Sequence, residues 1–299
     1  MPRIMKVFGL AMFVIGVGVG CGKKPEPKPE AKPETQPAPP EKAKPTPKPK
    51  SKPKPGPSAK QPDLIFGAYN EFDTKTQLRN ISFALGAYEN THKHFPAGIV
   101  GPDGNLGLSW RVALLPYMDD EAAKLYKEFK LAEGWDSPDN KKLLTKMPKL
   151  FATPGTAAAQ ERTYLRMFAG PKAFIPLPGG AAAGANMAAH WGARPGQPAR
   201  GRAPADITDG TANTLMIVEA NEPVEWTKPE YLVITDDAPA GSLPKLGLFG
   251  KGFVGMMCDT SVHSVPEKVT EKSLRALIST NAGDAPGSDV NIYLPPPKK

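Results

Sequence analysis

The sequence predicts an α+β domain that follows a long, non-globular N-terminal part. Apolar residues recur at helical spacing between residues 76 and 90. After residue 160, short apolar runs typical of strands dominate instead, and residues 23–60 show neither pattern. Helices that come first and strands that come later favour an α+β fold with a mainly antiparallel sheet over an alternating α/β fold.

Residues 1–21 have the three parts of a signal peptide. Arg3 and Lys6 precede residues 7–19, which are all apolar or Gly, and small residues precede Cys21. The apolar run is shorter than the roughly 20 residues that cross a bilayer. Its end resembles the bacterial lipobox, although Gly18 stands where Leu is usual, so we expect lipid on Cys21. Ordinary signal-peptide cleavage and a retained short membrane helix are the alternatives.

Residues 22–60 form a Lys/Pro-rich segment, here called the tether, with 11 Lys, 4 Glu and 13 Pro. The chain carries +8, the tether +7 and residues 1–21 +2, which leaves −1 for residues 61–299. The expected domain therefore has no surplus of cations to contact phosphates, and we expect no nucleic-acid partner. Proline at this density favours an extended, disordered spacer. A second hypothesis is that its lysines also contact anionic envelope polymers or lipid headgroups.

The exported domain, residues 61–299, begins with its clearest helix at residues 76–90. Leu78, Ile81, Leu85 and Tyr88 lie on one face of that helix at the expected spacing. We expect a break at residues 95–98 and a turn at 101–104. An apolar run at 109–115 ends at Pro116, and further helices are expected at 121–131 and 140–147.

The second half of the domain predicts strands at residues 163–168, 214–218, 231–235 and 252–258. A last helix is expected at 271–279. Residues 171–204 are rich in Gly, Ala and Pro and predict a long loop insertion. Loops of this length are usually functional, mobile or inserted.

A series of short motifs runs in order from Leu78 to Asn281. It includes Phe95-Pro96-Ala97-Gly98, Leu108-Ser109-Trp110-Arg111-Val112, Trp135-Asp136-Ser137-Pro138, Ile207-Thr208-Asp209-Gly210, Val224-Glu225-Trp226-Thr227, Asp259-Thr260-Ser261-Val262 and Leu274-Arg275-Ala276-Leu277. The series resembles the domain of unknown function 1559, a family expanded in planctomycete bacteria and similar to the pseudopilins of type II secretion (protein G-like). The resemblance implies a pilin-like N-terminal helix packed on the sheet.

Two departures from that family matter. Members usually begin with a prepilin-like leader and a long apolar helix, whereas a lipobox and the tether stand in that place here. Assembly into a pilus is therefore less expected for this chain. Thr260 stands where the family usually has Gly, in a turn for which the resemblance implies a positive φ.

Few side chains suggest chemistry, and we expect no catalytic residue and no cofactor. The sequence has no Gly-x-Ser-x-Gly, His-Glu-x-x-His or Walker pattern. His92 and His94 could offer two imidazoles to a metal, but with no Cys or carboxylate at ligand spacing a solvated or capping role is preferred. Asp206, Asp209 and Asn213 are weak candidates for an oxygen-lined cation loop, for which a tight turn is the preferred interpretation.

Other polar and aromatic residues have structural interpretations. Trp110, Trp135 and Trp226 lie beside prolines and are expected to anchor loops to the core rather than stack on sugars. Cys258, in an apolar run, is expected to be a small buried side chain. The aspartates at 236–237 are expected in a solvated loop.

These features predict a membrane-anchored, non-catalytic envelope lipoprotein with a pseudopilin-like domain and a structural or binding role. The alternative is a ligand- or polysaccharide-binding envelope module that uses the 171–204 loop and exposed tryptophans, and an envelope hydrolase is a third hypothesis. The expected partner is the membrane, reached through the lipid anchor. Gly22 differs from the Asp retention signal of enteric bacteria, which points to the outer membrane or the periplasmic face of the envelope.

Overall fold

The computed structural model describes residues 71–153, 161–177, 188–235, 238–248 and 252–290. Cys21, the tether and the aspartates at 236–237 lie outside these residues. Helix α1, Glu71–His92, confirms the first predicted helix and extends it at both ends. Leu78, Ile81 and Leu85 are fully buried, so the face predicted by their spacing is the face that packs on the core.

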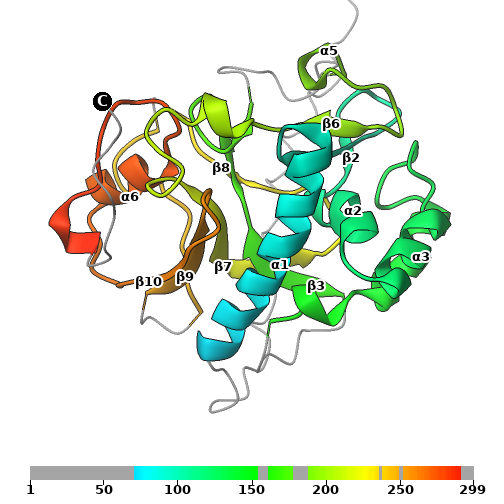
Figure 1. The fold of residues 1–299 in the computed structure, drawn as a ribbon, viewed down its shortest axis with the longest axis horizontal. Helices are drawn as coiled ribbons and strands as arrows, with labels where there is room; N and C mark the ends of the chain where they lie inside the picture. The colour runs from blue at the N-terminus through cyan, green and yellow to red at the C-terminus, as the bar shows by residue number, and fades with distance from the viewer. Residues whose placement is uncertain (1–70, 154–160, 178–187, 236–237, 249–251, 291–299) are drawn as a thin grey trace, which may run out of the picture. The chain divides into compact units, whose positions relative to one another are not determined.

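Helix α1 lies across a four-stranded sheet of order β10-β9-β7-β3 (Figure 1). Its strands are β3 (Arg162–Arg166), β7 (Leu215–Glu225), β9 (Phe253–Met257) and β10 (Val262–Val265), and all neighbours are antiparallel. Helix α6, Glu271–Ile278, confirms the predicted last helix.

Alternate residues of β9 enter two different hydrophobic clusters. Val254 and Met256 pack in the cluster that contains the buried face of α1. Phe253 and Met257 pack in the cluster that contains Leu277 of α6. Successive side chains of a strand point to opposite faces, so the sheet is covered on both sides, by α1 on one and α6 on the other.

Two small sheets complete the strands. The first has the order β2-β1-β6, with β1 at Pro96–Val100, β2 at Leu106–Leu108 and β6 at Pro198–Arg200, all antiparallel. The second has the order β5-β4-β8, with β4 at Phe168–Gly170, β5 at Ile175–Pro176 and β8 at Leu232–Val233, all parallel. The α+β class with a mainly antiparallel sheet is thus confirmed.

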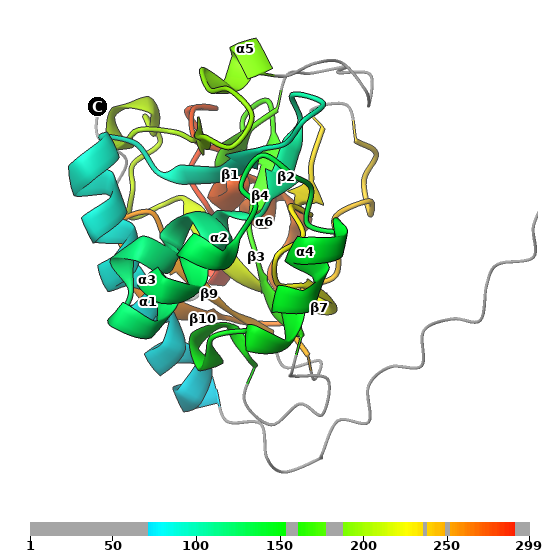
Figure 2. The ribbon, with the colours of Figure 1, turned by 90° about the vertical axis from the view of Figure 1, so that its right-hand side faces the viewer.

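Short helices cover the core beside α1, and Figure 2 shows α2, α3 and α4 in front of the sheet. Their bounds are α2 Trp110–Leu114, α3 Asp120–Glu128, α4 Pro138–Lys141 and α5 Ala188–Trp191. The 3-10 segments are η1 Leu115–Tyr117, η2 Lys142–Lys146, η3 Lys149–Phe151, η4 Pro204–Asp206 and η5 Ser288–Val290. The helices predicted at 121–131 and 140–147 correspond to α3 and to α4 followed by η2.

The sequence missed strands in three places. The expected break at residues 95–98 is the start of β1, whose five residues are all buried. The expected loop at 171–204 contains β5, α5 and β6, and Pro198 of β6 pairs with Ile99 of β1. The turn expected at 259–262 is present, at residues 258–260, and the strand that follows it, β10, was not predicted. Strands β1 and β6 are ordered by pairing with each other across about a hundred residues, whereas β10 pairs with its hairpin neighbour β9.

Candidate functional site

A groove of about 930 Å³ opens beside α1, between this helix, α3 and the segments η2 and η3. Phe83 of α1 lines it and is 76% exposed. Met118 and Met147 add flexible, polarisable thioethers. At the rim, Lys146 Nζ lies 2.6 Å from Glu128 Oε2, so opposite charges are paired there. Such a surface suits an apolar group of a ligand better than a free ion.

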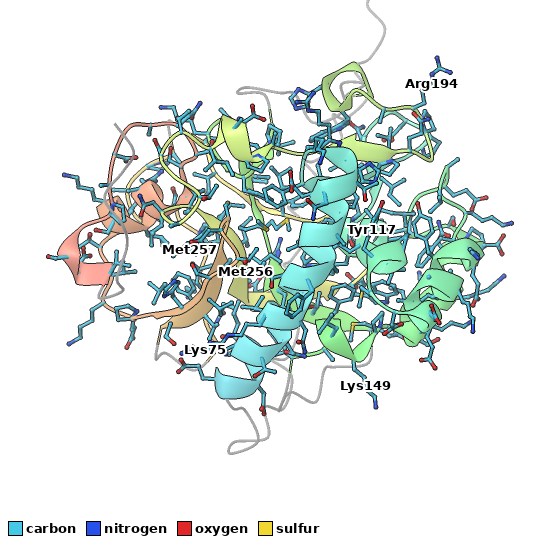
Figure 3. All side chains as sticks on the ribbon, viewed as in Figure 1. Lys75, Tyr117, Lys149, Arg194, Met256 and Met257 are labelled. Atoms are coloured by element: carbon cyan, nitrogen blue, oxygen red, sulfur yellow. The ribbon has the colours of Figure 1, made fainter. Side chains whose placement is uncertain are left out.

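Caps and a long-range hydrogen bond hold the walls of the groove. Asp119 caps α3 by accepting a hydrogen bond from the Ala122 N–H at 2.8 Å. Gln77 of α1 donates from Nε2 to the carbonyl of Lys149 at 3.2 Å, which fastens η3 to the helix. Figure 3 shows Lys149 and Tyr117 beside α1, with Tyr117 nearer the C-terminal end of the helix.

At that end the groove meets Tyr88, His92, His94 and Tyr117, here called the His–Tyr cluster. The ring of His92 stacks on that of Tyr88, with centroids 4.2 Å apart, and its Nε2 lies 2.6 Å from the Tyr117 hydroxyl. Lys93, at φ 63°, ends the helix in the left-handed conformation. The chain therefore reverses after α1, and the centroid of His94 comes within 5.8 Å of that of His92.

Burial sets the protonation of this cluster. Burial, with a smaller contribution from His94, lowers the pKa of His92 below its ordinary value. Burial, and then the phenols of Tyr117 and Tyr126, raise the pKa of Tyr88. The Tyr88 hydroxyl is buried and has no hydrogen-bond partner among the described residues. At neutral pH the His92 ring is therefore uncharged and keeps a lone pair.

Asp209, a weak cation-loop candidate, ties the C-terminal segment to the body of the domain. Its Oδ2 accepts hydrogen bonds from Ser279 Oγ at 3.0 Å and from the Ala282 N–H at 2.8 Å. Its Oδ1 accepts from the N–H of Gly283 at 2.8 Å. The side chain is buried, so both carboxylate oxygens are already engaged by protein donors.

The other two candidates for the cation loop make different contacts. Asp206 is exposed, and its Oδ2 accepts from the Ala203 N–H at 2.8 Å. Asn213 donates from Nδ2 to the backbone carbonyl of Asp209 at 3.1 Å. This is the geometry of the tight-turn interpretation. Within the described ranges, no three His, Cys, Asp or Glu side chains gather to hold a metal ion.

Asp259, Ser261 and His263 form a hydrogen-bonded chain at the β9–β10 hairpin. Ser261 Oγ lies 2.6 Å from Asp259 Oδ1 and 3.0 Å from His263 Nε2. In a hydrolytic triad the imidazole stands between the acid and the hydroxyl and accepts the hydroxyl proton. Here the serine stands in the middle and donates to the carboxylate, so the imidazole donates to the serine. This order does not activate Ser261 as a nucleophile.

Two of the three predicted tryptophan anchors are confirmed by their burial. Trp110 and Trp226 are buried, and Trp226 donates from Nε1 to the carbonyl of Leu144 at 2.9 Å. Trp135 is half-buried, with Lys228 Nζ 5.4 Å from the centre of its ring. Trp191, in the segment expected to be a loop, is also buried. The buried rings present no face on which a sugar could stack.

Arg111 is the residue whose environment the sequence least suggests. Its side chain is fully buried, and it donates to the carbonyls of Leu165 and Trp226. Among the described residues it forms no ion pair, and its Nε lacks a hydrogen-bond partner. Burial lowers the pKa of Arg111 to about 9. Neighbouring Trp and Val residues in the sequence give no sign that this cation lies in the core.

Two further features concern Cys258 and the helices. Cys258 is a buried free thiol, which confirms its predicted role as a small core residue, and burial raises its pKa well above the usual range.

No helix in the described part of the chain has the length and apolar character needed to cross a bilayer.

A family model described as protein of unknown function (DUF1559) matches residues 73–244. This range covers more than half of the 299 residues. It contains α1, the groove, the His–Tyr cluster and Arg111, and it ends before β9, β10 and α6. No curated protein and no solved structure matches the chain.

Proposed function

This chain belongs to the DUF1559 family of proteins of unknown function, and we propose that it is an exported lipoprotein with a non-catalytic domain at the cell envelope. The observation that carries the proposal is the position of Cys21, which follows 13 apolar or Gly residues (7–19) and Gly20. Acyl chains on this cysteine anchor the chain, with each buried methylene contributing about 0.8 kcal/mol.

The tether gives the anchored domain its reach. An extended proline-rich chain advances about 3.1 Å per residue, so residues 23–60 would reach on the order of 120 Å if fully extended. That length separates the domain from the bilayer while the lipid retains it. The same proposal includes a pseudopilin-like domain that lies in the cell envelope.

The non-catalytic part of the proposal rests on the side chains that could do chemistry. The serine of the Asp259–Ser261–His263 chain donates to a carboxylate and has no base that accepts its proton. The Cys258 thiol is buried and its raised pKa keeps it protonated. These two arrangements favour a structural or binding role.

The binding role rests on the groove with Phe83. A glycan array on the full chain tests this role, and saturable binding supports it. Phe83→Ser should abolish binding at the groove. Val233→Ser is the matched control because Val233 is also an exposed apolar residue, 59% exposed, and lies outside the groove lining. Equal loss in both variants would count against the groove.

Cell fractionation tests the anchor. We expect the wild-type chain in the membrane fraction and Cys21→Ala in the soluble exported fraction. Cys258→Ala is the matched control, because it removes the other cysteine and leaves the acylation site intact. Membrane association that survives Cys21→Ala would contradict the lipid anchor.

A further inference from the structure

We propose that the His–Tyr cluster is a binding site for a divalent transition-metal ion such as Zn²⁺, with His92, His94 and Tyr117 as its ligands. The site lies where α1 ends and the groove begins. It does not depend on the lipid anchor, so the two proposals fail separately.

The hydrogen bond of His94 leaves a ring nitrogen ready to bind a metal. Its Nδ1 lies 2.9 Å from the carbonyl of Phe95. A carbonyl only accepts, so Nδ1 carries the hydrogen and Nε2 of the neutral ring keeps its lone pair. Donation from the second ring nitrogen to a backbone carbonyl is the usual way in which proteins orient a metal-binding imidazole.

The separation of the two imidazoles suits a shared ion. Zinc lies about 2.0–2.1 Å from an imidazole nitrogen, and the two ring centroids are 5.8 Å apart. A separation of this size is compatible with one ion bound by a nitrogen of each ring. The left-handed Lys93 between them sets this spacing.

Tyr117 supplies an oxygen at the same place. Its hydroxyl lies 2.6 Å from Nε2 of His92, whereas two ligands of one tetrahedral zinc lie roughly 3.3 Å apart at the usual bond lengths. The distance between His92 Nε2 and the Tyr117 oxygen therefore needs to increase by roughly 0.7 Å for both atoms to bind one zinc ion. The bonds from the metal to Nε2 and to the oxygen replace the hydrogen bond between them, and the phenol proton passes to solvent.

A second observation comes from Tyr88, whose ring supports His92. The two rings stack with their centroids 4.2 Å apart, which holds the His92 imidazole in place. Two imidazoles and a phenol favour ions of the zinc, nickel or copper type. Calcium and magnesium prefer carboxylate and carbonyl oxygens, which this cluster does not offer.

The test is a Zn²⁺ titration of the full-length protein after treatment with a chelator, followed by calorimetry and by the histidine ring signals in proton NMR. The chain has four histidines, which provides matched controls. We expect one saturable site, weakened at least tenfold by His92→Ala and by His94→Ala. His190→Ala and His263→Ala should leave the affinity unchanged, and Ca²⁺ should not compete.

A thermal melt of each variant without metal shows whether it is folded, and His94→Gln replaces His94→Ala if the alanine variant is not. In the NMR spectra, zinc should shift the ring signals of His92 and His94 alone. Absence of a saturable site in the wild type overturns the proposal. So does retention of the affinity in the double variant of His92 and His94, or an equal loss in His263→Ala.

Discussion

Asp209→Asn separates the two interpretations of the 206–213 loop. The carboxylate accepts three hydrogen bonds, two at Oδ2 and one at Oδ1. An asparagine keeps acceptors at Oδ2, but its amide then points at the N–H of Gly283. One charge-assisted hydrogen bond is lost and two donors face each other. The free energy of unfolding should therefore fall by about 1.5–3 kcal/mol. In a domain of this size each kcal/mol corresponds to about 2–4 °C, so we expect the midpoint of thermal unfolding to fall by about 3–12 °C.

The assay is thermal unfolding followed by circular dichroism, with Asp206→Asn as the matched control. Asp206 is exposed and accepts one bond, from Ala203, so its replacement should cost about 1 kcal/mol or less. Addition of Ca²⁺ should leave the midpoint of the wild type unchanged, because both oxygens of Asp209 are held by protein donors. Equal losses in the two variants would refute the reasoning. A rise in the wild-type midpoint with Ca²⁺ that Asp209→Asn abolishes would do so as well.

Substitutions at three residues test other parts of the structure. Thr260 holds φ 72° at the hairpin turn, so Thr260→Gly should stabilise the domain by about 1 kcal/mol in a denaturant titration, and a loss of stability would contradict the assigned strain. Arg111→Ala leaves a cavity and an unpaired carbonyl at Leu165, so the free energy of unfolding should fall by about 3–5 kcal/mol in the same titration. Arg111→Met fills the space without a buried charge, so its loss of stability should be clearly smaller. Burial lowers the pKa of His92 from 6.5, so protonation favours the unfolded chain: stability measured in a chelator should be full above about pH 6.5 and fall as the pH drops below it. This fall should be smaller in His92→Gln, and an identical pH profile would exclude His92 as its cause.

The helices were predictable because their signals are local. The spacing of Leu78, Ile81 and Leu85 marks the buried face of α1, and α6 shows the same periodicity. Strand β9 was predictable from an apolar run that ends at Cys258. These segments carry enough side-chain pattern to specify their own conformation.

Most strands of the small sheets were not predictable because they depend on distant partners, although β8 lies in the run predicted at 231–235. Strand β6 is a Pro-Ala-Arg tripeptide that becomes a strand by pairing with β1, about a hundred residues earlier. The groove and the contact of Tyr117 with the His92–His94 pair were missed for the same reason. His92 and Tyr117 come together only because η1 packs beside α1, and their spacing of 25 residues has no periodic meaning. The burial of Arg111 likewise depends on carbonyls from β3 and from the segment after β7.

The intact mass of the mature protein tests the lipid anchor, the central claim, most directly. The account predicts a wild-type chain that begins at Cys21 and carries the added mass of two or three acyl chains. Cys21→Ala should lack this mass, and Cys258→Ala should keep it. A mature wild-type chain without acyl mass, or one cleaved elsewhere, would contradict the account.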